Sequence, residues 1–504
     1  MVEKTIMPLY VIIFTLLMRV TQQNVVSTVQ GRIRGVVHDG YVSYLGVPYA
    51  TEVEQGRFKK AGIAPFWLGV RDSHEVTCSP VAVVQDCLRL DIHVPSTSGH
   101  WPVLVWVAGG GAHYNAKHMA LKDIIMVMVH HRIGPSGFMC LKEEQIPGNA
   151  AVKDVVLALR WVRDNIVAFH GNPSRVVLAG QSLGAAIVEA ITLSTMGNGL
   201  YHGVILQSGS ILSPWAFNYD AKERAIKLLD LFYDTDNMTN LFLSTKLEEL
   251  AGKSFKLNVP YFPLGLCIEA VSKHEETLLT EAPYDILLSR KFVRVPMILG
   301  YNTNEAYVFS SMLVEAKVSK SMSGDISFLL PEELKFLSDR EMKQASRQVK
   351  DKYFSNMSIS SLLAYHRDAY FVNHIHRSAR LQAAAHPVYY YQFSHSGNVG
   401  VQEEPSVKKT GAAHSDELAY LFSNRNLDGN DNTVQYNLLK LWTNFVKYLN
   451  PTYKESTTWD PLDPDNPRIL DISSELKMIE YPHSKTASMW DDMYDKYYYS
   501  RNRG

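Results

Sequence analysis

The segment from position 171 to 190 restricts the fold more than any other part of the sequence. It reads "GNPSRVVLAGQSLGAAIVEA" and contains the pattern Gly-x-Ser-x-Gly, centred on Ser182. The β-branched run "RVVLA" before the pattern is typical of a strand buried on both faces of a parallel sheet, and "LGAAIVEAITLSTM" after it is rich in helix formers. A strand, a tight turn and a helix would present Ser182 as a nucleophile, and the two glycines would prevent clashes where strand and helix meet. The pattern is short, so an ordinary serine in a turn is the alternative.

The same alternation of strand and helix continues on both sides of the turn. "WPVLVWVAGGG" and "DIIMVMV" predict buried strands, the segment 149–171 has apolar residues at helical spacing, and "HGVILQS" predicts a further strand. This order predicts an α/β fold with a mostly parallel central sheet flanked by helices. Because no linker, repeat or low-complexity block interrupts the chain, we expect one domain over residues 23–504.

Composition excludes several classes of protein. Of the 504 residues 46% are hydrophobic and 20% are charged, which favours a large folded core over disorder. The formal net charge is −1 and charges of both signs are interspersed, so we expect no nucleic-acid partner.

The N-terminus predicts export. Lys4 precedes an apolar stretch too short for a membrane span, which favours a signal peptide at residues 1–22 over the alternative of a membrane anchor. Glycosylation sequons begin at Asn237 and Asn356. We therefore expect a secreted, extracellular glycoprotein without a stable membrane anchor.

Four cysteines are present, and a large core needs few disulfides. Cys78 and Cys87 lie close in sequence around a loop, and we predict that they are bridged. Cys140, in "GFMCL", is predicted to be a buried free thiol, and the state of Cys267 is left open.

A serine nucleophile needs oxyanion donors, an acid and a base. The three glycines at 109–111 follow a predicted strand, so their N–H groups could stand beside Ser182, although a plain glycine turn is the alternative. The acid and then the histidine are expected later in the chain. Glu305 and His414 both lie in loops after predicted strands, but other Glu and His residues exist, and position alone does not choose between them.

The chain resembles the type-B carboxylesterases, which include the cholinesterases and the insect juvenile hormone and antennal esterases. The motifs that carry this resemblance extend over most of the chain; they are "GRIRGVVHDGYVSYLGVPYA", "RF" at 57–58, "QDCLRLDIHVP", the glycine run, "GNPSRVVLAGQSLG", "LQSGS", "GYNTNEA" and "GAAHSDEL". The resemblance implies an α/β-hydrolase fold. It also implies that Ser182 is the nucleophile, Glu305 the acid and His414 the base.

Further roles follow from the same resemblance. The N–H groups of Gly110, Gly111 and Leu183 are expected to form the oxyanion hole, and Ser208 in "QSGS" is similar to a serine that supports the catalytic residues in this family. Gln181, where many members have glutamate, is similar to the juvenile hormone esterases.

The departures from the family pattern are also informative. Ala108 stands where the family usually has histidine, and Leu183 where it has alanine; we expect the larger side chain of Leu183 to lower turnover. Gln85 replaces a glutamate thought to pair with the arginine equivalent to Arg57, and "HHRIG" replaces "NYRLG". The short interval between the first two cysteines argues against a cholinesterase, because the longer loop of those enzymes carries the tryptophan that binds choline.

The sequence therefore predicts a secreted serine carboxylesterase that acts on a small-molecule ester through an acyl-enzyme, without metal or organic cofactor. The alternative is a catalytically weak or inactive binding or adhesion protein that keeps the same fold. His374 and His376 in "NHIH" could suggest a metal site, but helical spacing would point them apart. Neither the physiological ester nor the oligomeric state follows from the sequence.

Overall fold

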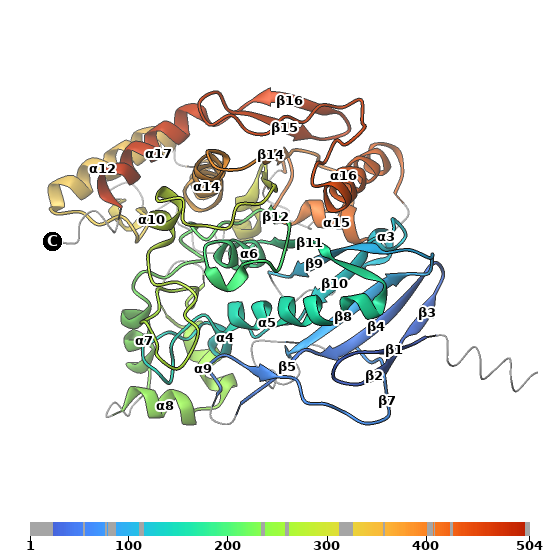
Figure 1. The fold of residues 1–504 in the computed structure, drawn as a ribbon. Helices are drawn as coiled ribbons and strands as arrows, with labels where there is room; N and C mark the ends of the chain where they lie inside the picture. The colour runs from blue at the N-terminus through green and yellow to red at the C-terminus, as the bar shows by residue number, and fades with distance from the viewer. Residues whose placement is uncertain are drawn as a thin grey trace, which may run out of the picture.

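The computed structural model describes residues 24–53, 56–75, 78, 87–109, 115–232, 237–257, 262–311, 326–355, 358–400, 407, 409–423 and 427–498. The predicted signal peptide at residues 1–22 and the sequon at Asn356 lie outside the described residues. Figure 1 shows a central sheet with helices on both of its faces.

One large sheet runs through the described part of the chain. In order across it, the eleven strands are β16 (Leu476–Glu480), β15 (Arg468–Ile472), β14 (Val388–Phe393), β13 (Met297–Asn302), β12 (Gly203–Gln207), β11 (Gly171–Gln181), β9 (Trp101–Val107), β10 (Ile125–Val129), β8 (Arg89–Pro95), β4 (Tyr41–Pro48) and β3 (Val36–His38). The strands from β15 to β10 pair in parallel, and β16, β8, β4 and β3 pair antiparallel at the two edges. The predicted α/β fold with a mostly parallel sheet is confirmed.

Two small sheets lie near the N-terminus. Their strands are β1 (Val25–Ser27), β2 (Arg32–Arg34) and β7 (Val70–Asp72) in one, and β5 (Ala50–Thr51) and β6 (Gly62–Ile63) in the other.

Both faces of the large sheet are buried, which explains the uninterrupted apolar runs in its strands. In β9, Val103 and Val105 point into the core on one face, while Leu104 and Trp106 point into a second core on the other. A strand covered on both faces has no solvated side, so its sequence does not alternate between apolar and polar residues.

Helices cover the two faces unequally (Figure 1). The larger core takes apolar side chains from α4 (Pro135–Phe138), α5 (Ala150–Asn165), α6 (Leu183–Thr192), α7 (Ala221–Leu229), α8 (Met238–Ser244), α9 (Leu247–Ser254), α10 (Pro283–Leu288), α12 (Asp339–Tyr353), α13 (Ile359–Arg367), α14 (Asn373–Ala383) and α17 (Ser484–Tyr497). The smaller core lies under α3 (Lys117–Ala120), α15 (Asp416–Phe422) and α16 (Gly429–Tyr448). None of the described helices is long and apolar enough to cross a membrane.

Two disulfides are present. Cys78 and Cys87 are bridged, with their Cα atoms 4.8 Å apart. Cys140 is bridged to Cys267, with a Cα–Cα distance of 6.7 Å. The prediction that Cys140 is a free thiol was therefore wrong. Its partner lies 127 residues away in the sequence, and only the folded chain brings the two together.

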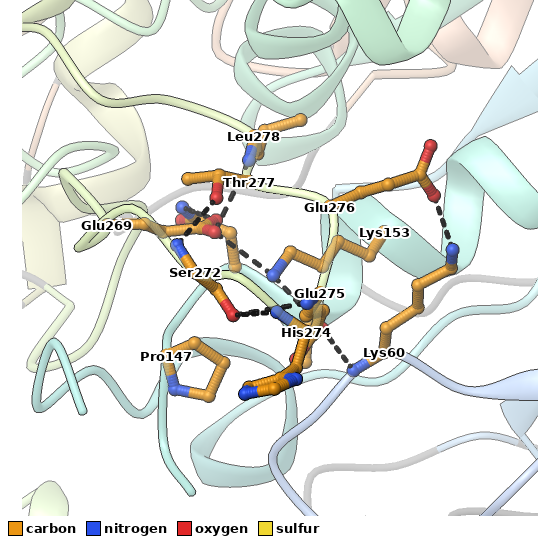
Figure 2. A network of polar contacts seen from close by, with 12 residues as sticks. Lys60, Pro147, Lys153, Glu269, Ser272, His274, Glu275, Glu276, Thr277 and Leu278 are labelled. Carbon is orange, nitrogen blue, oxygen red and sulfur yellow. Dashed lines mark hydrogen bonds and ion pairs between the residues drawn. The ribbon is translucent and has the colours of Figure 1, made fainter. Parts of the chain in front are cut away.

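A buried polar network lies next to the second disulfide (Figure 2). The Lys153 side chain, on α5, is only 1% exposed, and its Nζ lies 3.0 Å from a Glu269 oxygen and 3.1 Å from a Glu275 oxygen. Asn149, at the start of α5, donates to Glu269 (2.7 Å) and to the carbonyl of Cys267 (2.9 Å). Burial raises the pKa of Glu269, while Lys153 and Asn149 act to lower it. The network ties the start of α5 to the segment 267–278.

Replacing Lys153 by methionine is expected to lower the free energy of unfolding by roughly 3 to 5 kcal/mol, because it leaves Glu269 buried without its cation. Urea unfolding followed by circular dichroism measures this change. The matched control is Lys60→Met, which removes the partly exposed ion pair of Lys60 with Glu276 drawn in Figure 2 and is expected to cost about 0 to 1 kcal/mol. Equal losses in the two variants would contradict the buried-charge argument.

Candidate active site

Ser182 lies in a sharp turn between β11 and α6. Its backbone angles are φ 58° and ψ −126°, a region that a residue with a side chain rarely adopts. Such strain is found at functional turns, where the surrounding structure enforces it. The geometry is that of a nucleophile elbow, which presents the serine hydroxyl at the carboxyl edge of the sheet.

The two glycines of the motif are required by close packing. A Cβ on Gly180 would lie 2.4 Å from backbone atoms of Gly184, and a Cβ on Gly184 would lie 2.1 Å from the carbonyl oxygen of Val107. Both distances are shorter than any van der Waals contact. Only glycine lets the helix after Ser182 approach β9 and β11 this closely.

The glycine run begins beside the elbow. A Cβ on Gly109 would lie 2.4 Å from the carbonyl oxygen of Gln181 and 3.0 Å from the backbone nitrogen of Leu183. Gly110 and Gly111 lie outside the described residues, so their predicted role as oxyanion donors stays a prediction. The Leu183 N–H, at the first position of α6, is one of the helix N-terminal donors without an intrahelical partner.

Glu305 and His414 meet at the same edge of the sheet. Glu305 follows β13 and begins the short helix η3 (Glu305–Phe309), and His414 precedes α15. The imidazole Nδ1 lies 2.6 Å from a Glu305 carboxylate oxygen, although the residues are 109 positions apart. The second carboxylate oxygen of Glu305 accepts the N–H of Asn302 at 2.7 Å. Both side chains are buried, so this is a charge-assisted bond in a water-poor site.

The environment of His414 favours its charged form. Burial acts to lower its pKa, but the Glu305 carboxylate opposes this, with smaller contributions from Glu417 and Asp416, so that the pKa is raised above 6.5. A base with a raised pKa loses its proton at higher pH. A reaction that needs neutral His414 should therefore reach full rate above the range expected of an ordinary imidazole.

The far nitrogen of the imidazole has an unpredicted partner. Among the described residues, His414 Nε2 is hydrogen-bonded to the side-chain nitrogen of Gln181 at 3.2 Å, and none of its hydrogen bonds reaches the Ser182 hydroxyl. The same Gln181 nitrogen donates to Ser415 Oγ at 2.9 Å. Contacts between nucleophile and base often tighten only when substrate binds.

Ser208 lies near the turn of Ser182, but its hydroxyl does not make the hydrogen bond expected of a residue that supports the catalytic groups. Its N–H donates to the carbonyl of Gly300 at 2.9 Å, and its neighbour Gly209 packs against the carbonyl of Ser182. The Ser208 hydroxyl is buried and finds no hydrogen-bond partner among the described residues.

A second buried carboxyl lies beneath the pair of Glu305 and His414. Glu417, on α15, accepts from Gln207 (3.0 Å) and Asn302 (2.6 Å). Burial raises its pKa to about 7, and the charge of Glu305 adds to the increase. The motif "GAAHSDEL" contains Glu417, but nothing in the sequence distinguishes a carboxyl buried below the site from one in solvent.

Two residues connected with the departures from the family pattern make contacts in the described part of the chain. His131, in "HHRIG", lies with Nε2 3.3 Å from the carbonyl oxygen of Ala108, the residue before the glycine run. Arg57 donates to the carbonyl of Leu243 at 3.0 Å, at the end of α8. The expected loss of a partner at Gln85 falls on a residue outside the described part of the chain.

A cavity of about 510 Å³ reaches Ala108, the residue before Gly109, but Ser182, Glu305 and His414 are not among its lining residues. Its lining includes Trp106, Ala108, Asn115 and the hydrogen-bonded pair of Asp91 and His130, whose Oδ2 and Nε2 atoms are 2.8 Å apart. The mixed apolar and polar lining suits one arm of a small organic molecule.

The structure does not bring His374 and His376 to a common ligand. His374 contacts the carbonyl of Ala369 and the hydroxyl of Tyr494, whereas His376 stacks on Tyr481 with ring centroids 3.8 Å apart. Within the described ranges, no group of three or more His, Cys, Asp or Glu side chains is arranged to hold a metal ion.

Comparison with known proteins identifies relatives over nearly the whole chain. The model of the carboxylesterase family matches residues 22–490. The chain is 28% identical to pyrethroid hydrolase Ces2e of Rattus norvegicus, over 88% of this chain and 86% of that protein. It is 27% identical to venom carboxylesterase-6 of Apis mellifera, over 92% and 93% of the two chains.

A solved structure shares the fold. The crystal structure of juvenile hormone esterase from Manduca sexta, with OTFP covalently attached, superposes with a TM-score of 0.85 at 25% identity. The match covers 94% of this chain and 99% of that one. The similarity is therefore not limited to isolated motifs but includes the architecture of nearly the whole chain.

Proposed function

Because the chain belongs to the carboxylesterase family, we propose that its carboxylic ester hydrolase activity operates through Ser182 as nucleophile, His414 as base and Glu305 as the acid that orients His414. The observation that carries this proposal is the 2.6 Å bond of His414 to Glu305 at the sheet edge that also bears the strained turn of Ser182. The substrate is a small-molecule ester.

The reaction proceeds in two halves. His414 Nε2 takes the proton of Ser182 Oγ as this oxygen forms a bond to the ester carbonyl carbon, and Glu305 stabilises the imidazolium. The oxyanion is held by the N–H groups of Gly110, Gly111 and Leu183. The imidazolium then gives its proton to the leaving alcohol, which leaves an acyl group on Ser182. His414 takes a proton from water as the water oxygen attacks this acyl-enzyme, and the imidazolium then returns the proton to Ser182 Oγ as the bond to the acyl carbon breaks and the acid is released.

An organophosphate tests the proposal. Purified protein is expected to take up one equivalent at Ser182, located by peptide mass mapping, because only an activated serine reacts. The labelling rate should rise with pH through a limb above 6.5, since neutral His414 is the reactive form and its pKa is raised. Folded protein that takes up no label and hydrolyses no ester would instead support a binding or adhesion protein with this fold.

The same proposal includes export of a single domain over residues 23–504. Two disulfides are typical of an oxidising compartment. Asn237 is exposed at the N-terminus of α8, where its side-chain oxygen accepts the N–H of Asn240 and leaves the amide nitrogen free for a glycan. Secreted material whose sequence still begins at Met1, or which carries no glycan, would contradict this part.

A further inference from the structure

Gln181 occupies an unusual place for a neutral side chain. It is the last residue of β11, it immediately precedes Ser182, and it is buried. Its side-chain nitrogen contacts two atoms of the loop before α15, namely His414 Nε2 at 3.2 Å and Ser415 Oγ at 2.9 Å. These positions are 233 and 234 residues away in sequence. The contact therefore joins the nucleophile strand directly to the proposed base.

The direction of this hydrogen bond follows from the other side of the ring. Glu305 is an acceptor when ionised, so His414 Nδ1 carries a proton and donates to it. In the neutral imidazole, Nε2 then has a single lone pair and can only accept. An amide nitrogen can only donate, so the N–H of Gln181 points at that lone pair. This lone pair is also the one that must receive the proton of Ser182.

We propose that Gln181 is a positioning residue that holds the lone pair of His414 Nε2 in the resting protein and releases it when the Ser182 hydroxyl takes its place. The inference rests on the proposed function of Ser182 and His414. During the reaction the proton moves from Ser182 Oγ to His414 Nε2, which then becomes a donor. The Gln181 N–H cannot accept from it and keeps only its bond to Ser415 Oγ.

The surroundings of His414 therefore stabilise its neutral and its protonated form to different degrees. The Gln181 N–H stabilises neutral His414 and has no favourable contact with the imidazolium. The other titratable groups that face the ring are carboxyl groups, which act in the opposite direction when they are ionised: Glu305, and Glu417 and Asp416 on α15. Lys409 is paired with Asp416 at 2.7 Å. Phe371 packs against the ring with centroids 5.2 Å apart and carries no charge.

The competing explanation is that the contact of Gln181 has only a structural role, because it also connects β11 to the loop at 414–415. The two explanations differ in one measurable respect. A structural tie affects stability and turnover, whereas a bond to the lone pair also shifts the pH at which His414 becomes reactive.

The experiment compares wild-type protein with Gln181→Met and Gln181→Glu. The first readout is the acid limb of kcat/KM for an aryl ester. The second is the pH dependence of carbethoxylation of residue 414 by diethyl pyrocarbonate, followed by peptide mass mapping, which reports neutral imidazole without requiring activity. The control is Gln392→Met on β14, a buried glutamine that bonds Tyr301 (3.2 Å) and Asp471 (2.7 Å).

Methionine has a similar length but no donor, so the limb of Gln181→Met is expected to move to higher pH by roughly half to one pH unit in both readouts. Glutamate would accept from the imidazolium, so its limb is expected to move up by about one to three pH units. Gln392→Met should lower the melting temperature and leave the limb at the wild-type pH.

Two outcomes would overturn the inference. One is a limb in Gln181→Met that coincides with that of Gln392→Met, and the other is a limb in Gln181→Glu at or below the wild-type pH. If wild-type protein hydrolyses no ester and takes up no organophosphate, the proposed function fails, and the carbethoxylation series still decides whether Gln181 holds the lone pair.

Discussion

Replacement of Ser182 by alanine is expected to lower kcat/KM for short-chain aryl esters by roughly 10⁴- to 10⁶-fold, because the nucleophile is removed and only water is left to attack. His414→Ala should have an effect of similar size, since a serine hydroxyl without a base is a weak nucleophile. Ser182→Ala also leaves the packing unchanged and removes no hydrogen bond of the described structure, so the fold should persist. Initial rates and melting temperatures measure both effects.

The double variant distinguishes a catalytic unit from two independent contributions. If Ser182 and His414 act together, Ser182→Ala with His414→Ala should be little worse than either single change, because each alone already stops the same proton transfer. Losses that multiply would show that Ser182 and His414 contribute independently, and a Ser182→Ala variant that retains more than about a tenth of the activity would place the nucleophile elsewhere.

The parts of this site that could be predicted from the sequence are local. The strand, turn and helix around Ser182 are encoded in about twenty consecutive residues, and the close approach of Gly184 to Val107 gives the physical reason for the glycine. Likewise, the apolar run of β9 predicts burial on both faces, which the two cores confirm.

The partners of these local elements could not be derived from pattern and spacing. Glu305 and His414 were selected by resemblance, because many acids and histidines follow strands, and the 2.6 Å contact depends on how β13 and β14 lie side by side. The bond of Gln181 to His414 spans 233 positions and has no local signal.

Buried polar residues show the same limit. Helical spacing assigns the apolar face of α5 correctly, but it treats Lys153 as an ordinary polar position. Its burial is tolerated only because Glu269 and Glu275, which lie more than a hundred residues later in the sequence, contact it in the folded chain. The bridge of Cys140 to Cys267 lies in the same region, and it could not be predicted from the sequence for the same reason.

Glu305→Gln is expected to lower kcat by roughly 10⁴-fold while leaving the fold intact, because the substitution is isosteric and selects the wrong tautomer of His414. The N–H of Asn302 donates to one carboxylate oxygen of Glu305 at 2.7 Å, so a glutamine there must keep its carbonyl oxygen on that side. Its NH₂ group then faces His414 Nδ1 and donates to it. The imidazole proton moves to Nε2, where no lone pair remains to accept the proton of Ser182.

The pH dependence provides an independent check of this argument. Without the Glu305 charge, burial is the dominant influence on His414, and its pKa should fall, so the acid limb of the residual activity moves to lower pH. Glu305→Asp is the control, because it keeps the charge and the correct tautomer of His414 and only shortens the side chain. It should retain more activity than Glu305→Gln, and the acid limb of its pH profile should stay at high pH. If Glu305→Gln stayed within tenfold of wild type, or if its limb moved to higher pH, Glu305 would not be the residue that orients the base.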